Sequence, residues 1–135
     1  VADLGVPLGE ALLAPTRIYC RPVLGCLEGG ARIKGMVHIT GGGFYENIPR
    51  ILPEGTAAVI DRSSFTPHPV FALIQREGQV EEREMFTTFN MGIGLMMMAD
   101  RTDADALIGM LREAGEKPVM IGTVEERTAG AVVLV

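Results

Sequence analysis

Three consecutive glycines occupy positions 41–43, directly after Thr40. Glycine loses more conformational freedom on folding than any other residue, so such a run indicates a need for bare backbone. Free N–H groups at the first turn of a helix, together with the helix dipole, bind anions, and glycine lets an anion approach the backbone. Thr40, Gly41, Gly42 and Gly43 therefore predict either a phosphate-binding loop or a tight turn beside a close helix–strand contact, and the spacing does not choose between them.

The loop does not match the two best-known phosphate motifs. Glu46 stands where the dinucleotide fingerprint would place its third glycine, and no Gly-Lys-Ser or Gly-Lys-Thr follows, as a P-loop requires. If residues 40–43 bind an anion, they do so without either of these nucleotide signatures, and the tight turn remains the alternative.

Polar residues on both flanks of the loop add candidate site groups. His38 could face outward as a polar or acid–base group, or it could be a satisfied strand histidine. Asn47 and Arg50 are three residues apart and so share one face of a helix. Arg50 could pair with a phosphate through two hydrogen bonds, or it could form a salt bridge with Glu46 at i,i+4 spacing.

A second glycine-rich stretch lies at residues 90–94, with Asn90, Gly92 and Gly94 at the entry to an apolar segment. Glycine in a strand often marks the close approach of a ligand or of another backbone, and the alternative is a bulge or helix-over-strand packing. The three methionines at 96–98 are expected to fill the core. His68, just before Pro69 at a helix start, is interpreted as structural.

Composition limits the classes of function. The chain has 135 residues, 47% of them hydrophobic and 21% charged, which is typical of one folded domain. Its net charge is -5 and it has no basic cluster, so binding of nucleic acid or of an anionic membrane is not expected as its main task. No apolar run approaches the roughly 20 residues of a membrane-spanning helix. An anionic ligand would be held by local dipoles or a few placed cations.

Cys20 and Cys26 are the only cysteines. No histidine stands at ligand spacing, so no metal site is predicted, and we expect two partly buried, reduced thiols of a cytosolic protein. The first residue is Val, and the opening sequence is typical of the middle of a protein, so a fragment or processed chain is expected.

The elements that must position these groups alternate along the chain. Residues 1–15 are predicted to be a linker-like lead-in with a short helix near 8–14. Thr102 is expected to be an N-cap, Gly115 a C-cap, and Pro49 to end or bend its helix. Helices are predicted at 16–30, 44–52, 68–78, 81–90 and 102–115, and strands at 32–40, 56–63, 91–99, 117–128 and 131–135. This order predicts an α/β (α+β) single domain, with a mixed β-sheet and helices packed on one face.

Three segments together resemble one enzyme family. The segments "LGEALLAPTRIYCRPVL", "HITGGGFYENIPRILP" and "FNMGIG" are similar, in order, to the phosphoribosylformylglycinamidine cyclo-ligases, also called aminoimidazole ribonucleotide synthetases. The resemblance spans residues 8 to about 124 and covers only the C-terminal domain of that family. It implies that residues 16–135 form this domain. The family's N-terminal ATP-binding domain has no counterpart in this chain.

The resemblance also implies a reaction. In this family, formylglycinamidine ribonucleotide and ATP give aminoimidazole ribonucleotide, ADP and phosphate. ATP, accompanied by Mg²⁺, phosphorylates the formamide oxygen, and an internal nitrogen then closes the ring. The active cleft lies between the two domains, so this chain would supply one wall and would be inactive alone. A cytoplasmic homodimer is implied for the full enzyme.

The matching positions carry expected roles. His38 matches "HITGGG" as a catalytic group, and residues 40–43 would bind the substrate phosphate rather than ATP, because the family's nucleotide motif lies in the other domain. Asn47 and Arg50 match "ENIPR", and Asn90 matches "FNMGIG". Two alternatives remain: a related ATP-dependent member of the superfamily, such as formylglycinamidine synthetase, or a stand-alone phosphate- or metabolite-binding module.

Overall fold

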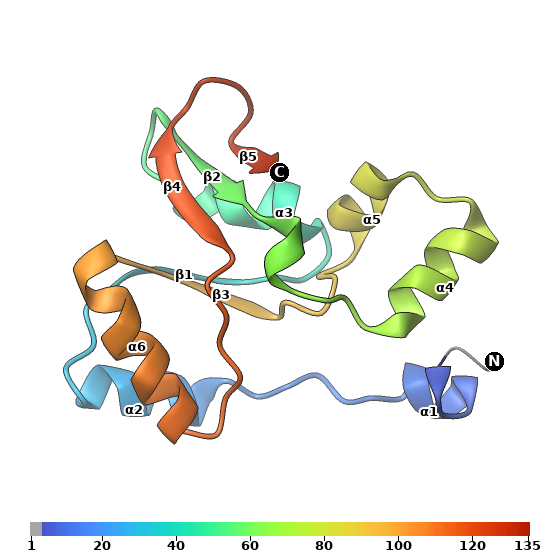
Figure 1. The fold of residues 1–135 in the computed structure, drawn as a ribbon, viewed down its shortest axis with the longest axis horizontal. Coiled ribbons are helices and arrows are strands. Elements are labelled where there is room, and N and C mark those ends of the chain that lie inside the picture. The colour runs from blue at the N-terminus through green and yellow to red at the C-terminus, as the bar shows by residue number, and fades with distance from the viewer. Residues whose placement is uncertain (1–3) are drawn as a thin grey trace.

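The computed structural model describes residues 4–135 of the chain. Its first element, α1 (Leu8–Leu12), stands apart at the end of an extended segment that leads into α2 (Cys20–Glu28) (Figure 1). The short helix lies within the predicted range 8–14. No helix within the described part of the chain has the length and apolar character needed to cross a bilayer.

The five strands among the described residues form two sheets. In the first, β1 (Ile33–His38) pairs antiparallel with β3 (Leu95–Ala99), with His38 opposite Leu95. In the second, β2 (Thr56–Ile60) lies between β4 (Gly122–Glu126), which is antiparallel to it, and β5 (Val132–Leu134), which is parallel to it. The mixed α/β class is confirmed, while the strands divide between two sheets instead of forming one.

The remaining helices fall into two groups (Figure 1). Helix α6 (Arg101–Glu113) lies beside α2 on one side of the β1–β3 pair. Helix α3 (Gly43–Asn47) continues as the 3-10 turn Ile48–Ile51, and lies near the second sheet together with α5 (Glu82–Thr88). A 3-10 turn at Arg62–Ser64 precedes α4 (Pro69–Gly78), which packs against α5.

The core is built around α3. Phe44 and Ile48 are fully buried, and the Phe44 ring packs edge-on against Phe86, with ring centroids 5.1 Å apart. Met85, on the same helix as Phe86, is also fully buried. Because α3 follows the glycine loop directly, burial of its first aromatic residue holds one end of that loop rigidly in the core.

Several boundaries differ from the predicted ones. Residues 91–94 form a turn instead of the start of a strand, because Met91 and Gly92 have φ values of +52° and +91°. Thr102 was wrongly predicted as an N-cap: Asp100 occupies that position and makes no side-chain capping bond. Pro49 lies where α3 changes to a 3-10 turn, so the predicted helix bends there as expected.

Candidate functional site

The two glycine-rich segments meet at one end of the β1–β3 sheet. His38 is the last residue of β1 and pairs with Leu95, the first residue of β3. One residue further on, the Ile39 N–H donates to the Gly94 carbonyl at 2.8 Å. The loop at residues 40–43 and the turn at residues 90–94 are therefore neighbours, although about fifty residues separate them in the sequence.

Two of the three loop glycines are required by the fold itself. Gly43 has a φ of +53°, and a Cβ there would collide with the Phe86 carbonyl oxygen and lie 2.9 Å from that of Phe89. Gly42 has a φ of +95°, and a Cβ there would lie 2.8 Å from the Cβ of Glu46. Conformation and packing account for both residues, as the tight-turn interpretation predicts.

Gly41 has neither of these reasons to be glycine. Its φ lies outside the left-handed region, no atom would lie within 4 Å of a Cβ added there, and the residue is exposed. The N–H groups of Gly41 and Gly42 donate to no group among the residues that the structure describes. Gly41 is thus the loop position at which an external ligand would best account for a missing side chain.

Asn47 holds the loop from within the core. Its side chain is only 2% exposed, and its Nδ2 donates to the carbonyls of Gly43 at 2.7 Å, Gly41 at 3.2 Å and Thr40 at 3.4 Å. The Thr40 hydroxyl donates to Asn47 Oδ1 at 3.5 Å. These bonds occupy the amide, so the geometry gives Asn47 the task of shaping the loop.

Arg50 lies in the 3-10 turn after α3 and is exposed, whereas Asn47 is buried, so the two do not form one exposed face. The change from α-helix to 3-10 turn at Ile48 breaks the predicted spacing. Within residues 4–135, Arg50 forms no ion pair with Glu46 or with any other carboxylate. Its guanidinium is therefore available to an anion.

Asn90 shapes the second segment. Its side-chain Oδ1 accepts the Gly92 N–H at 2.9 Å, and its carbonyl accepts the Ile93 N–H, also at 2.9 Å. Positive φ values at both central residues are those of a type I′ turn. Of the two roles considered for glycine in this segment, the structure supports close packing at Gly94, where a Cβ would collide with the Tyr19 hydroxyl.

The chain's two histidines both lie against this turn region. The exposed His38 ring meets the Tyr19 ring edge-on, with centroids 6.0 Å apart and planes at 71°. The His68 ring lies near Gly92, where an added Cβ would be 3.4 Å from the His68 Cδ2 atom. Sequence reasoning missed Tyr19, because nothing in the spacing of residue 19 indicates that it reaches residues 38 and 94.

An ion pair holds the segment that carries Tyr19. Arg17 Nη2 lies 2.9 Å from Glu116 Oε2, beyond the end of α6. The hydrogen bond and charge of Glu116 raise the pKa of Arg17, and burial raises the pKa of the Tyr19 phenol. Tyr19 is thus held in its neutral form beside His38 across the physiological pH range.

Two cavities lie away from the loop. One cavity of about 500 Å³ lies between α1 and α4, and another of about 450 Å³ lies beside β5. Neither is lined by residues 38–43 or 90–94. Among residues 4–135, no group of three or more His, Cys, Asp or Glu side chains is placed to hold a metal ion.

Comparison with known proteins identifies the class to which this fold and loop belong. The family model described as "AIR synthase related protein, C-terminal domain" matches residues 1–135. The chain therefore belongs to this family.

Several similar curated proteins carry the same name. The chain is 52% identical over 122 residues to a phosphoribosylformylglycinamidine cyclo-ligase of Alkaliphilus metalliredigens, and the match covers 90% of this chain and 35% of that protein. It is 47% identical over 128 residues to that of Lachnospira eligens, with 95% and 38% covered, and 48% identical over 130 residues to that of Caldicellulosiruptor saccharolyticus, with 96% and 38% covered. The chain thus spans little more than a third of the length of these relatives.

Proposed function

We propose that this chain is the C-terminal domain of a phosphoribosylformylglycinamidine cyclo-ligase. In this proposal, residues 1–15 are the lead-in and residues 16–135 form the domain. It acts with an N-terminal ATP-binding domain in the ATP-dependent closure of formylglycinamidine ribonucleotide to aminoimidazole ribonucleotide, a step of purine biosynthesis. The support is a family match over the whole chain and cyclo-ligase relatives about half identical to it.

The loop at residues 40–43 would bind the 5-phosphate of the substrate. The observation that carries this assignment is Gly41: packing and φ explain Gly42 and Gly43, while Gly41 is exposed, unobstructed and beside unused N–H groups. Backbone N–H groups donating to an anionic oxygen form charge-assisted hydrogen bonds, which are about twice as strong as neutral ones. The exposed Arg50 would contribute further donors, and the Thr40 hydroxyl would turn from Asn47 Oδ1 to the phosphate.

Glu46 determines from which side the phosphate would approach. Its carboxylate lies over Gly42, where an added Cβ would be 2.6 Å from Oε2. A phosphate placed beside this carboxylate would be repelled, so we expect it to bind on the Thr40 and Gly41 side of the loop. His38, at the adjoining end of β1, would then face the cleft as an acid–base group.

ATP, Mg²⁺ and the second chain of a homodimer would engage the rest of the enzyme. We assign Mg²⁺ to the N-terminal domain, where it would accompany the phosphates of ATP. The task left to this chain is to bind and orient the substrate. Such positioning accounts for a large part of phosphoryl-transfer catalysis. A cytoplasmic location is part of the same proposal.

An NMR titration of the chain tests the ligand of the loop. Formylglycinamidine ribonucleotide, ribose 5-phosphate and ATP are added separately while the amides of Gly41 and Gly42 are followed, with Gly25 and Gly109 as remote controls. We expect the first two ligands to shift Gly41 and Gly42 at lower concentration than ATP does. Shifts caused by ATP alone would reverse the assignment, and no shift with any ligand would contradict a preformed phosphate loop.

An activity assay tests the proposed enzyme. The chain alone is expected to give no ring closure with substrate and ATP, whereas addition of the N-terminal part of a cyclo-ligase relative should restore it. Ring closure by the isolated chain would contradict the two-domain proposal. Loop binding without any restored activity would favour the stand-alone phosphate-binding module.

A further inference from the structure

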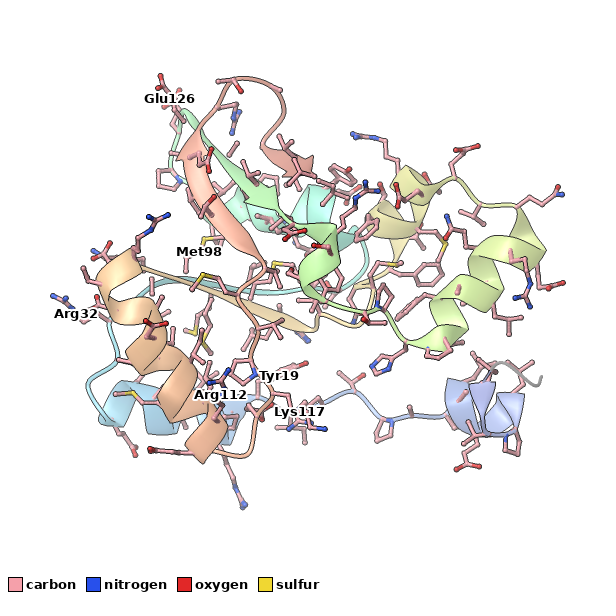
Figure 2. All side chains as sticks on the ribbon, viewed as in Figure 1. Tyr19, Arg32, Met98, Arg112, Lys117 and Glu126 are labelled. Atoms are coloured by element: carbon pink, nitrogen blue, oxygen red, sulfur yellow. The ribbon has the colours of Figure 1, made fainter. Side chains whose placement is uncertain are left out.

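Tyr19 connects three parts of the molecule that the sequence separates. Its carbonyl accepts the Val23 N–H at 3.1 Å at the start of α2. Its ring lies on Gly94, where an added Cβ would be 3.0 Å from the ring Cζ and 3.3 Å from Cε2. The same ring meets His38 edge-on. Figure 2 shows Tyr19 near the point where the extended lead-in joins α2, below the β1–β3 pair.

We propose that Tyr19 is the residue that positions the His38 imidazole at the substrate-facing end of β1. The proposal rests on the proposed function, because it gives His38 a role toward the substrate. His38 is exposed, and among the described residues the Tyr19 ring is its one aromatic neighbour. An exposed imidazole without such a contact would exchange freely between rotamers.

Gly94 is part of this arrangement because the Tyr19 ring packs directly on it. Its φ lies outside the left-handed region, so its backbone does not require glycine. The missing side chain leaves room for the Tyr19 hydroxyl and ring, and this packing explains one glycine of the second glycine-rich segment without a ligand. The Arg17–Glu116 ion pair holds the same segment two residues earlier.

Gly94→Ala should displace the Tyr19 ring without changing Tyr19 itself, because the added methyl group would collide with the Tyr19 hydroxyl. A double-mutant cycle combines Gly94→Ala with Tyr19→Ala, and the His38 Cε1–Hε1 NMR signal and its shift on adding formylglycinamidine ribonucleotide are measured. Each single variant should move the free His38 signal and weaken ligand binding about three- to tenfold, the range expected for loss of one aromatic pair. The double variant should resemble Tyr19→Ala alone.

Tyr19→Phe is the conservative variant. It keeps the edge-on ring and removes only the hydroxyl, so the His38 signal and ligand affinity should stay near those of the parent chain. Tyr19→Leu replaces Tyr19→Ala if truncation unfolds the chain, because it retains apolar volume without an aromatic edge.

The outcomes separate this inference from the proposed function. An unchanged His38 signal in Tyr19→Ala or Tyr19→Leu would overturn it, as would an equal effect of Gly94→Ala with and without Tyr19. If no ligand shifts the parent chain, the proposed function fails, and the signal of the free His38 still decides whether Tyr19 positions it.

Discussion

The absence of a side chain has a different physical reason at each of residues 41–43. Gly43 meets the Phe86 carbonyl, Gly42 adopts a strongly positive φ, and Gly41 has an ordinary φ and open space around it. The sequence presents them as equivalent. The structure assigns a packing role to Gly42 and Gly43, whereas ligand binding at Gly41 stays a proposal.

Substitution of Gly43 should therefore be costly. Gly43→Ala places a methyl group against a backbone carbonyl and forces a positive φ on alanine, so the free energy of unfolding should fall by about 3 kcal/mol or more. Gly41→Ala should change it by less than about 0.5 kcal/mol. Urea denaturation of the two variants measures both values, and similar losses would contradict the distinction between these positions.

The Asp61 carboxylate gives a pH-dependent contribution to stability. It accepts the Ser63 hydroxyl at 2.6 Å and the Ser63 N–H at 2.8 Å, and these bonds lower the pKa of Asp61. A lowered pKa favours the charged form in the folded state, so the contribution is present above the ordinary pKa of about 4 and is lost as the pH falls through the lowered, folded-state pKa.

Asp61→Asn tests the direction in which the stability contribution of Asp61 changes with pH. The variant should be less stable than the parent chain at pH 7, and the difference should shrink as the pH falls below the ordinary aspartate pKa and through the lowered pKa of Asp61. Thermal unfolding across this range gives the comparison, with Asp105→Asn as an exposed control. A difference that grows toward low pH would be the opposite of what we expect.

At the scale of elements, local sequence patterns predict which helices and strands exist better than they predict where these elements begin and end. Helix α6 and the bend at Pro49 follow from apolar spacing and from the missing proline N–H. The apolar character of residues 91–94 predicts a strand, whereas they form a turn, because the positive φ of Met91 has no clear sequence signal. The separation into two sheets arises from long-range pairing, which single-segment patterns do not contain.

Helix α2 offers an element-scale prediction through its two thiols. Cys20 is exposed, whereas Cys26 is 1% exposed, and burial raises the pKa of Cys26. The thiolate is the reactive form, so Cys20 should be alkylated at neutral pH while Cys26 reacts only after unfolding. Mass spectrometry of the native chain after iodoacetamide gives the ratio, and equal labelling would show that α2 does not pack as described.

At the scale of the whole molecule, the sequence identified the candidate residues but not their relations. His38 and residues 40–43 are adjacent in sequence, so their proximity was predictable. Their contact with the turn at residues 90–94 depends on the β1–β3 register, and Tyr19 reaches the same place from the lead-in. The burial of Asn47 beside an exposed Arg50 depends on a change of helix type that spacing rules do not foresee.

The central claim is that the exposed half of the glycine loop binds the phosphate of a ribonucleotide. The most direct test is the affinity of Gly41→Ala for formylglycinamidine ribonucleotide, measured by NMR titration beside Gly25→Ala. Gly25 is a matched control, because it is also exposed, has no positive φ and would have nothing within 4 Å of an added Cβ. We predict at least about tenfold weaker binding for Gly41→Ala, equivalent to loss of one charge-assisted hydrogen bond, and unchanged binding for Gly25→Ala. Equal affinity of the two variants would contradict the claim.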